Sequence, residues 1–268
     1  MRLHFRSSAL VALCTATLVM SPGIRAQTAA PQKYDVITVE VKPGANAQFE
    51  EFVRKLRDAV EKNKGSERWL ASQSMSGNPV YTFTRPFGTW AGEFGQAASD
   101  PLIKAYGEQE AARLAGLLAA AVANESTAFY VARPDLSRPR PPAAAGAAAA
   151  TPVAVEYLDL NVKLGKEQQF EGYVKKLIEA TNKTAPSAFW EMRQRQFGPG
   201  NAAGYRVVLT FATWADLDTP AKPLQQRLTE QFGAAEGERL QGLATDALQG
   251  MNSRLNRVRI DLERPPTN

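Results

Sequence analysis

The sequence predicts an α+β fold made of two tandem ferredoxin-like βαββαβ repeats, packed sheet to sheet as an intrachain pseudo-dimer. Three observations support this prediction. One residue pattern occurs twice, the spacing of hydrophobic residues changes in the same order within each copy, and a Pro/Ala-rich stretch separates the copies. Each copy holds about 105 residues, a usual size for one domain.

The two copies share residues at matched positions over most of their length. Val41-Lys42-Pro43-Gly44 returns as Val162-Lys163-Leu164-Gly165, and Phe87-Gly88-Thr89-Trp90-Ala91 returns as Phe211-Ala212-Thr213-Trp214-Ala215. Further matched pairs are Phe49 and Phe170, Trp69 and Trp190, Gly107 and Gly233, Arg113 and Arg239, Arg133 and Arg259, and Asp135 and Asp261. The matches indicate that both copies have the same architecture.

Each copy is predicted to begin with a half-buried strand followed by an amphipathic helix. Hydrophobic residues alternate with others over residues 36–41 and 157–162, which is the period of a strand. From Phe49 and from Phe170 the spacing lengthens to the single stripe of a helix.

The rest of each copy is predicted to be a hairpin, a broken helix and a last strand. The hairpin strands cover residues 69–75 and 80–84, and residues 190–197 and 205–211. The helix after Thr89 or Thr213 breaks near Gly107 or Gly233 and then resumes. The last strands cover residues 127–133 and 253–260.

The predicted division of the chain has four parts. These are a signal peptide over residues 1–26, a first repeat over 27–139, a linker over 140–152 and a second repeat over 153–268. The linker contains Pro141-Pro142 and an Ala-rich run over residues 143–150, a composition that cannot bury a specific face.

The N-terminal segment is typical of an export signal. Arg2 and Arg6 precede an apolar run over residues 9–20, Pro22-Gly23 follows, and Ala26 offers a small residue for cleavage. The run is shorter than the ~20 residues that a membrane-spanning helix needs. We therefore expect a periplasmic or secreted protein with no stable membrane insertion after cleavage.

Removal of this segment limits the chemistry that the chain offers. His4 and Cys14 are the only His and Cys residues, and without them a Ser-His-Asp triad, a Cys nucleophile, a thiolate zinc site and a disulfide are excluded. The net charge falls from +5 to +2, because the segment holds three basic and no acidic residues. With basic and acidic residues interspersed, we expect no nucleic-acid partner. We also expect no metal, no cofactor and no assigned catalytic residue.

The chain resembles the dimeric α+β barrel superfamily. The resemblance rests on Val41-Lys42-Pro43-Gly44 leading into an amphipathic helix with Phe49-Glu50, within a βαββαβ unit, and it covers both repeats. The superfamily includes antibiotic-biosynthesis-type monooxygenases, muconolactone-isomerase-like and stress-response proteins, and haem-binding relatives. The resemblance implies two sheets paired around a central cavity. The haem-binding branch uses a His ligand that the mature chain lacks, and no family catalytic pattern matches residue by residue.

Strand alternation selects the candidate binding residues. If Ile37 and Val39 face the helices, the alternate residues of the same strand face the other sheet. The first and third strands are neighbours in this topology, so Arg206 is expected beside Asp159 or Asn161. The candidate ligand-binding residues are Thr38, Glu40, Asp159, Asn161, Arg193, Arg206 and Arg254.

These residues have two interpretations. A guanidinium on a partly dry wall suits carboxylate oxygens, which predicts an anion-accepting cavity between the sheets. Alternatively, Arg206, Asp159, Glu40 and Arg193 only pair with one another across the sheet interface, because partly buried charges usually have partners.

Three functions follow, and the sequence leaves open whether the protein is an enzyme. The first is an exported, non-catalytic module that binds a small acidic or amphipathic molecule. The second is a cofactor-independent monooxygenase or isomerase, in which Arg206 stabilises an enolate-like anion and Glu40 or Asp159 moves a proton. The third is a structural or protein-interaction module. A lone carboxylate with a raised pKa favours the enzyme, and a paired carboxylate favours the binding module.

Overall fold

The computed structural model describes residues 31–94, 101–141, 151–199, 203–218 and 221–265. The predicted signal peptide and most of the predicted linker lie outside these residues. Both therefore stay predictions.

The first half of the described chain contains four strands and their helices. In order they are β1 (Lys33–Val41), α1 (Asn46–Lys62), β2 (Leu70–Ser74), β3 (Val80–Phe87), α2 (Trp90–Phe94), α3 (Pro101–Tyr106), α4 (Glu108–Ala121), β4 (Val122–Ala132) and the 3₁₀ turn η1 (Pro134–Leu136).

The second half repeats this order. It contains β5 (Ala154–Val162), α5 (Glu167–Thr184), β6 (Glu191–Phe197), β7 (Ala203–Phe211), α6 (Ala215–Asp218), α7 (Leu224–Phe232), α8 (Ala234–Ala247), β8 (Leu248–Val258) and η2 (Ile260–Leu262). The predicted order of strands is confirmed in both halves, but the single helix predicted between Thr213 and Gly233 is two helices, α6 and α7.

The helix break and the last strand of each half show how local sequence sets the elements. Gly107 and Gly233 separate consecutive helices at φ values of 82° and 86°, a region that residues with a Cβ avoid. The last strands begin at Val122 and Leu248, five residues earlier than predicted, because each of these residues is already extended where its helix ends.

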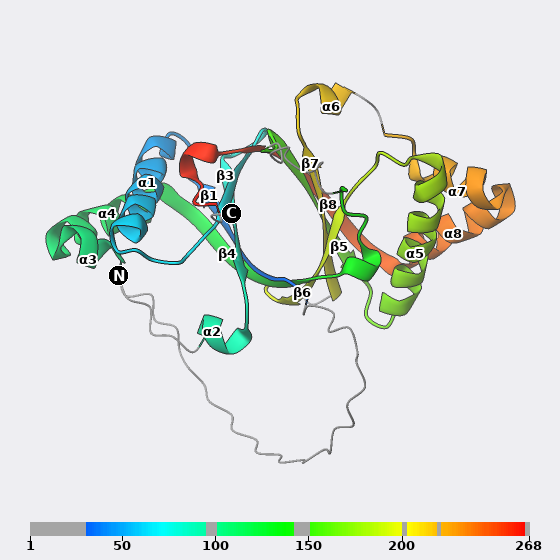
Figure 1. Ribbon diagram of the computed structural model, residues 1–268, viewed down its shortest axis with the longest axis horizontal. Helices are drawn as coiled ribbons and strands as arrows, with labels where there is room; N and C mark the ends of the chain where they lie inside the picture. Colours follow the sequence, from blue (N-terminus) through cyan, green and yellow to red (C-terminus); the bar gives the residue numbers. More distant parts are fainter. Residues whose placement is uncertain (1–30, 95–100, 142–150, 200–202, 219–220, 266–268) are drawn as a thin grey trace, which may run out of the picture. The chain divides into compact units, whose positions relative to one another are not determined.

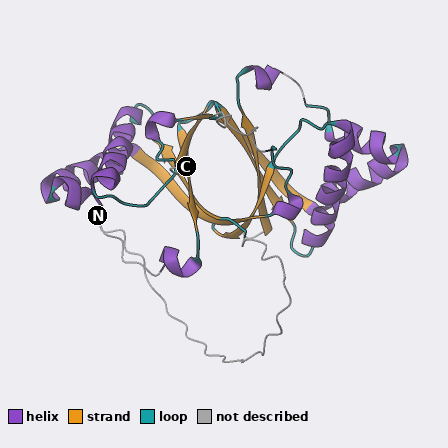
Figure 2. Ribbon diagram, viewed as in Figure 1, coloured by secondary structure: helices purple, strands orange, loops and turns teal. Residues whose placement is uncertain are grey.

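The eight strands form one closed antiparallel sheet in the order β1-β3-β2-β8-β5-β7-β6-β4. Figure 1 shows both sets of strands, and Figure 2 shows the strands enclosing the centre with the helices outside them. The halves join where β2 pairs with β8 and where β4 pairs with β6.

This edge pairing corrects the expectation of two separate sheets that only pack face to face. An unpaired edge strand leaves its N–H and C=O groups without partners. Pairing Ser72 with Val258 in one seam, and Ala132 with Arg193 in the other, gives these backbone groups partners and closes the barrel.

The outer face of the sheet packs against the helices as strand alternation predicts. Val39 and Val41 belong to a core cluster with Phe49 of α1, and Leu160 and Val162 belong to the corresponding cluster with Phe170 of α5. Burial of each Phe side chain contributes about 2 kcal/mol to stability. The other face of each strand is therefore left for the interior of the barrel.

The end of each half crosses to the other half. We call residues 133–138 and 259–264 the crossed tails. η2 contacts α1 and β2, and η1 contacts α5 and β6. The indole Nε1 of Trp69 donates to the carbonyl oxygen of Leu262 at 2.8 Å, and that of Trp190 donates to Leu136 at 3.0 Å.

An arginine fastens each crossed tail to the helix of the other half. Arg259 Nη1 lies 2.5 Å from Glu50 Oε1 on α1. Arg133 Nη1 lies 2.5 Å from Glu171 Oε1 on α5. The two halves thus hold each other by the same set of contacts. Among the helices of the described residues, none combines the length and apolar character needed to cross a membrane.

Candidate functional site

The interior face of the barrel differs in character between the halves. Where the second half has Arg193 and Arg206, the first half has Ser72 and Thr82 at the matched positions. Asp159 likewise corresponds to Thr38. One wall of the barrel therefore carries hydroxyl groups, and the other carries guanidinium and carboxylate groups.

Arg206 and Asp159 form the centre of the charged wall. They lie opposite each other on β7 and β5, and Arg206 donates from Nε and Nη2 to the two carboxylate oxygens at 2.6 and 2.8 Å. The guanidinium also lies over the rings of Tyr130 and Tyr157, at 5.0 and 5.1 Å from their centroids. Arg206 is only 7% exposed. Burial, the largest single influence, acts to lower the pKa of the guanidinium, but the hydrogen bonds to Asp159 together with the charges of Asp159 and the neighbouring tyrosines raise it.

Arg193 forms a second charged pair beside the first. It lies opposite Arg206 in the β6–β7 register and donates from Nε and Nη2 to Glu191, both at 2.9 Å. Burial, the largest single influence, acts to raise the pKa of Glu191, but the charge of Arg193 and the hydrogen bonds from Arg193 and Tyr34 together lower it. The guanidinium carbon lies 3.7 Å from the ring centroid of Tyr34, whose pKa burial raises to about 12.

The two walls meet through a chain of polar contacts. Asn256 Nδ2 donates to Ser72 Oγ at 3.0 Å, and Ser72 Oγ lies 3.3 Å from the hydroxyl of Tyr157, whose ring lies under Arg206. Ser72 also pairs with Thr82 in the β2–β3 register. The polar side chains thus extend continuously from the hydroxyl wall to the charged wall.

Several buried polar atoms in this region have no hydrogen-bond partner within the described residues. They are Arg206 Nη1, Thr82 Oγ1, Thr84 Oγ1 and Asn256 Oδ1. Buried polar groups are satisfied in most proteins, and such atoms indicate a place for a water molecule or a ligand. We call these four side chains, with Ser72, Tyr130, Tyr157 and Asp159, the interior network.

The remaining predicted residues lie toward other parts of the strands. Glu40 accepts a hydrogen bond from Asn78 Nδ2 at 2.9 Å, and Asn161 accepts one from Arg195 Nη2 at 3.4 Å. Thr38 lies opposite Thr82.

Arg254 is half-buried and lies opposite Tyr157 in the β5–β8 register. Within the described ranges, no hydrogen bond or ion pair joins it to another side chain. Asp159 and Arg206 are thus brought together as expected, with Arg193 and Arg254 on flanking strands, whereas Glu40 bonds to the β2–β3 turn.

Sequence reasoning missed the aromatic part of the site and one carboxylate. Tyr34, Tyr130, Tyr157 and Glu191 were not among the predicted residues. For Tyr157 the alternation that selected Asp159 already gave the signal, because the two residues are separated by one position. Tyr34 lies four positions before Thr38, so alternation places both residues on the same face of their strand.

A surface cavity of about 660 Å³ lies outside the barrel at the β2–β8 seam. Its lining residues include Glu50, Gln73, Arg259 and Asp261. These side chains already bond to one another, because Arg259 donates to Glu50, to Gln73 and to Asp261. We therefore interpret this cavity as a surface depression beside the crossed tail of residues 259–264. We place the candidate site in the interior network.

The described residues offer no clear metal or haem site. No group of three or more His, Cys, Asp or Glu residues within the described ranges is arranged to hold a metal ion. Residues 31–268 also contain no His, so a His-ligated haem has no imidazole to bind. The residues present do not fit that group.

Comparisons with known proteins give a likeness in fold. No family model matches the chain, and no curated protein matches it in sequence. The structure is similar to that of a candidate monooxygenase from Fusobacterium nucleatum subsp. nucleatum, with a TM-score of 0.51, 10% identity, and coverage of 86% of this chain and 94% of that chain. It is also similar to a mutant chlorite dismutase from Candidatus Nitrospira defluvii, with a TM-score of 0.50, 9% identity, and coverage of 87% and 93%. These neighbours have the ferredoxin-like dimeric α+β barrel fold, and at such low identity the likeness establishes the fold alone.

Proposed function

We propose that the protein binds a small organic anion, most favourably an aromatic carboxylate, at the interior network. The observation that carries this proposal is the unpartnered, buried Nη1 of Arg206 beside two aromatic rings. A guanidinium offers a planar pair of N–H donors that suits a carboxylate. The rings of Tyr130 and Tyr157 add an apolar surface of the kind that an aromatic ligand packs against.

The hydroxyl wall supports the same proposal. Thr82 and Thr84 are 1% and 3% exposed, and their hydroxyl oxygens lack partners in the described structure. A buried hydroxyl without a hydrogen bond costs about 1–3 kcal/mol. A ligand with oxygen atoms on more than one side satisfies both walls at once.

The alternative is a cofactor-independent monooxygenase or isomerase, and the fold neighbours are consistent with it. Proton transfer needs a carboxylate that is free to accept a proton. Asp159 and Glu191 each make two hydrogen bonds to an arginine, which favours binding over proton transfer. We therefore place the binding function first.

We further propose that the two halves act as an intrachain pseudo-dimer. The matched crossed tails and the matched seams support this proposal. In this arrangement one half supplies the hydroxyl wall and the other half supplies the charged wall.

The Arg206→Ala variant tests the binding function. Benzoate is expected to raise the melting temperature of the wild-type protein, and this rise should be lost in the variant because the guanidinium is gone. Arg239→Ala is the matched control, because it removes an arginine from an ion pair on the surface of α8. An unchanged benzoate-dependent shift in Arg206→Ala would reject the site. Turnover of a substrate by the purified protein, lost on replacement of Asp159, would instead favour the enzyme.

A further inference from the structure

Arg227 on α7 is a buried arginine without a carboxylate partner. It is 4% exposed, and its Nε donates to the carbonyl oxygen of Lys222 at 2.8 Å. Its Nη1 lies 3.5 Å from the hydroxyl of Thr181, at the limit of a hydrogen bond. In the described part of the chain, Nη2 has no hydrogen-bond partner and no carboxylate lies within ion-pair distance. The nearby acid Glu230 is held by Lys222 and Gln226 instead.

The other buried arginines are balanced by acidic residues. Arg193, Arg206 and Arg259 each form an ion pair with at least one carboxylate. Arg264 bonds to backbone carbonyl groups; burial and the charge of Arg68 lower its pKa, and the negative charges of Glu61 and Glu67 act against them. Arg227 differs, because no Asp or Glu residue acts on its pKa: burial and the positive charge of Arg138 lower it, and only Tyr173 acts to raise it.

Arg138 lies at the same end of α5 and also lacks an acidic partner within the described residues. Its Nε donates to Asn182 Oδ1 at 2.7 Å, and its Nη2 donates to the carbonyl oxygen of Pro186 at 2.7 Å. It lies over the ring of Phe189, 5.1 Å from the centroid. Burial lowers the pKa of this guanidinium as well. Two guanidinium groups thus bond to neighbouring residues, Thr181 and Asn182, with neutral partners only.

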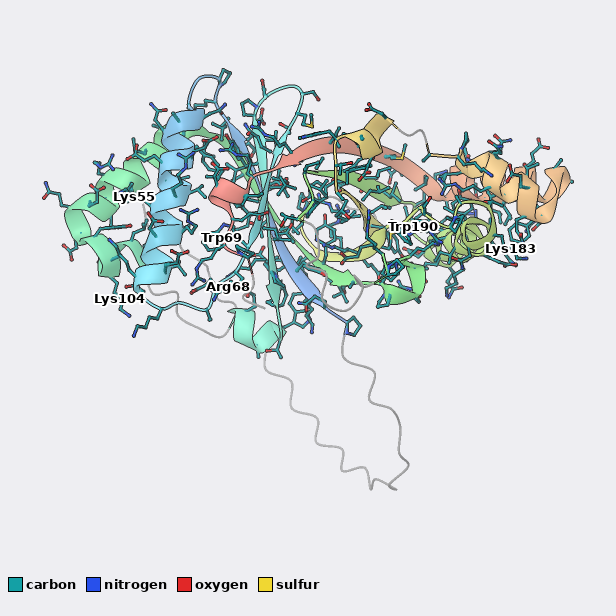
Figure 3. The ribbon with its side chains drawn as sticks, turned by 45° about the horizontal axis from the view of Figure 1, so that its top comes forward. Lys55, Arg68, Trp69, Lys104, Lys183 and Trp190 are labelled. Carbon is teal, nitrogen blue, oxygen red and sulfur yellow. The ribbon has the colours of Figure 1, made fainter. Side chains whose placement is uncertain are left out.

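The matched region of the first half is electrically balanced. There Arg264 takes the place of Arg138, and Glu61 and Glu67 stand where the second half has Asn182 and Ala188. Figure 3 labels Arg68 and Trp69 of this region, and in the second half it labels Trp190, the match of Trp69.

The two matched regions differ in the charge of their side chains. In the first half, Arg68 and Arg264 are offset by Glu61 and Glu67. In the second half, Phe189 replaces Arg68, and Arg227 stands where the first half has Pro101. At these matched positions the second half therefore has a formal charge of +2, from Arg138 and Arg227, and the first half has a formal charge of zero.

The end of α5 does not supply the missing negative charge. A helix C-terminus is equivalent to about −0.5 of an elementary charge. Against the charge of +2 on the two guanidinium groups, this leaves a charge of roughly +1.5 uncompensated. Poorly solvated guanidinium groups with no carboxylate beside them favour an anion from outside the chain as their complement.

We propose that Arg227 and Arg138 form a second anion site, separate from the interior network, that takes a compact oxyanion such as a phosphoryl or carboxylate group. The Nη2 of Arg227 provides free donors, and half-buried Arg138 forms the side that solvent reaches. The site occurs once because, at the matched positions, only the second half lacks both acids and has a buried arginine.

Melting curves in inorganic phosphate, compared with chloride at equal ionic strength, test this site. Phosphate should raise the melting temperature of the wild-type protein more than chloride does. The Arg227→Met variant should lose this phosphate-specific rise and bind phosphate at least about tenfold more weakly by calorimetry. The Asn182→Glu variant, which restores the acid of the first half, should also lose it, because an internal carboxylate then occupies the site.

Two controls separate this site from others. Arg239→Met removes a surface guanidinium, and Arg206→Met removes the interior one, and both should keep the phosphate response. Acetate in place of phosphate identifies the group: an Arg227-dependent rise with acetate assigns a carboxylate, and a rise with phosphate alone assigns a phosphoryl group. Equal effects of phosphate and chloride in the wild type, or a phosphate response retained in both Arg227→Met and Asn182→Glu, would overturn the proposal.

Discussion

Arg206 shows how one side chain gives the barrel interior its character. Its guanidinium is held by Asp159 on one side and by the rings of Tyr130 and Tyr157 on the others. The matched residue of the first half, Thr82, is neutral and small. The pair of Arg206 and Asp159 therefore exists in one half only, and the other half shows which neutral residues can take its place.

Replacing Asp159 alone should destabilise the protein, whereas replacing the pair should destabilise it much less. Asp159→Thr leaves the buried guanidinium of Arg206 without its carboxylate. Breaking a fully buried pair costs about 3–5 kcal/mol, and the partial exposure of Asp159 reduces this to roughly 2 kcal/mol. The double variant Asp159→Thr/Arg206→Thr copies Thr38 and Thr82 and should recover most of that loss.

Urea unfolding of the two variants and the wild type measures this prediction. Equal destabilisation in the single and double variants would contradict it, because the cost would then not come from an unpaired charge.

The site could be predicted from the sequence as far as strand alternation reaches. Alternation placed Arg206 beside Asp159 because the first and third strands are neighbours in a βαββαβ unit. It did not predict the stacking of Arg193 on Tyr34, because these residues lie in different halves and meet only through the closed barrel. It did not predict the isolation of Arg227 either, because a missing partner is a property of three-dimensional packing.

The crossed tails are the elements that tie the halves together. Each begins with an arginine, turns through η1 or η2, and receives an indole N–H from a Trp residue of the other half. The match of Trp69 with Trp190 is visible in the sequence. The exchange of tails between halves was not predicted, because nothing in a single repeat tells which half its last residues contact.

Removing either indole N–H should weaken the fold. Trp69→Phe leaves the carbonyl oxygen of Leu262 without its buried donor, and Trp190→Phe does the same to Leu136. Each change should lower the free energy of unfolding by about 1–3 kcal/mol. Chemical denaturation followed by circular dichroism measures the loss.

Trp214→Phe is the control for both variants. Its side chain is 46% exposed, so the change should stay within about 0.5 kcal/mol. A loss in Trp214→Phe as large as in Trp69→Phe would show that the tail hydrogen bonds are not the cause.

The molecule as a whole depends on carboxylates that stay ionised in the folded state. Hydrogen bonds from Arg259 lower the pKa of Glu50 and Asp261, and hydrogen bonds from Arg133 lower that of Glu171 and Asp135. Burial acts in the opposite direction on a few groups, and raises the pKa of Asp35.

Stability should therefore fall in acid. A carboxylate with a lowered pKa stabilises the fold above its ordinary pKa, and this contribution is lost as the pH falls through the folded value. Melting temperatures should decline below about pH 4.5, where the unfolded chain takes up protons first. The double variant Glu50→Gln/Glu171→Gln should show a shallower decline.

Asp35 should affect the pH dependence of stability in the opposite direction, which provides a check on this explanation. Its raised pKa means that protonation favours the folded state, so Asp35→Asn should make the acid decline steeper. A decline of the same slope in the wild type and in Glu50→Gln/Glu171→Gln would contradict the assignment to the crossed tails.

The general architecture was the most predictable part of the molecule. Periodicity and duplication indicated every strand and the order of the helices, because both depend on local residue spacing. The closure of the eight strands depends on long-range edge pairing, which leaves no periodic trace in either copy. The resemblance to the dimeric α+β barrel superfamily supplied the idea of paired sheets, and the seams show how they connect.

The unequal walls of the barrel have a consequence for how such a protein can evolve. An assembly of two identical chains must carry every substitution twice, so an arginine introduced at one place also appears at its symmetry mate. Joining both copies in one polypeptide removes that requirement. Arg193 can then face the barrel interior while its matched residue is Ser72, and the proposed ligand, if its two ends differ chemically, would be held in a single orientation.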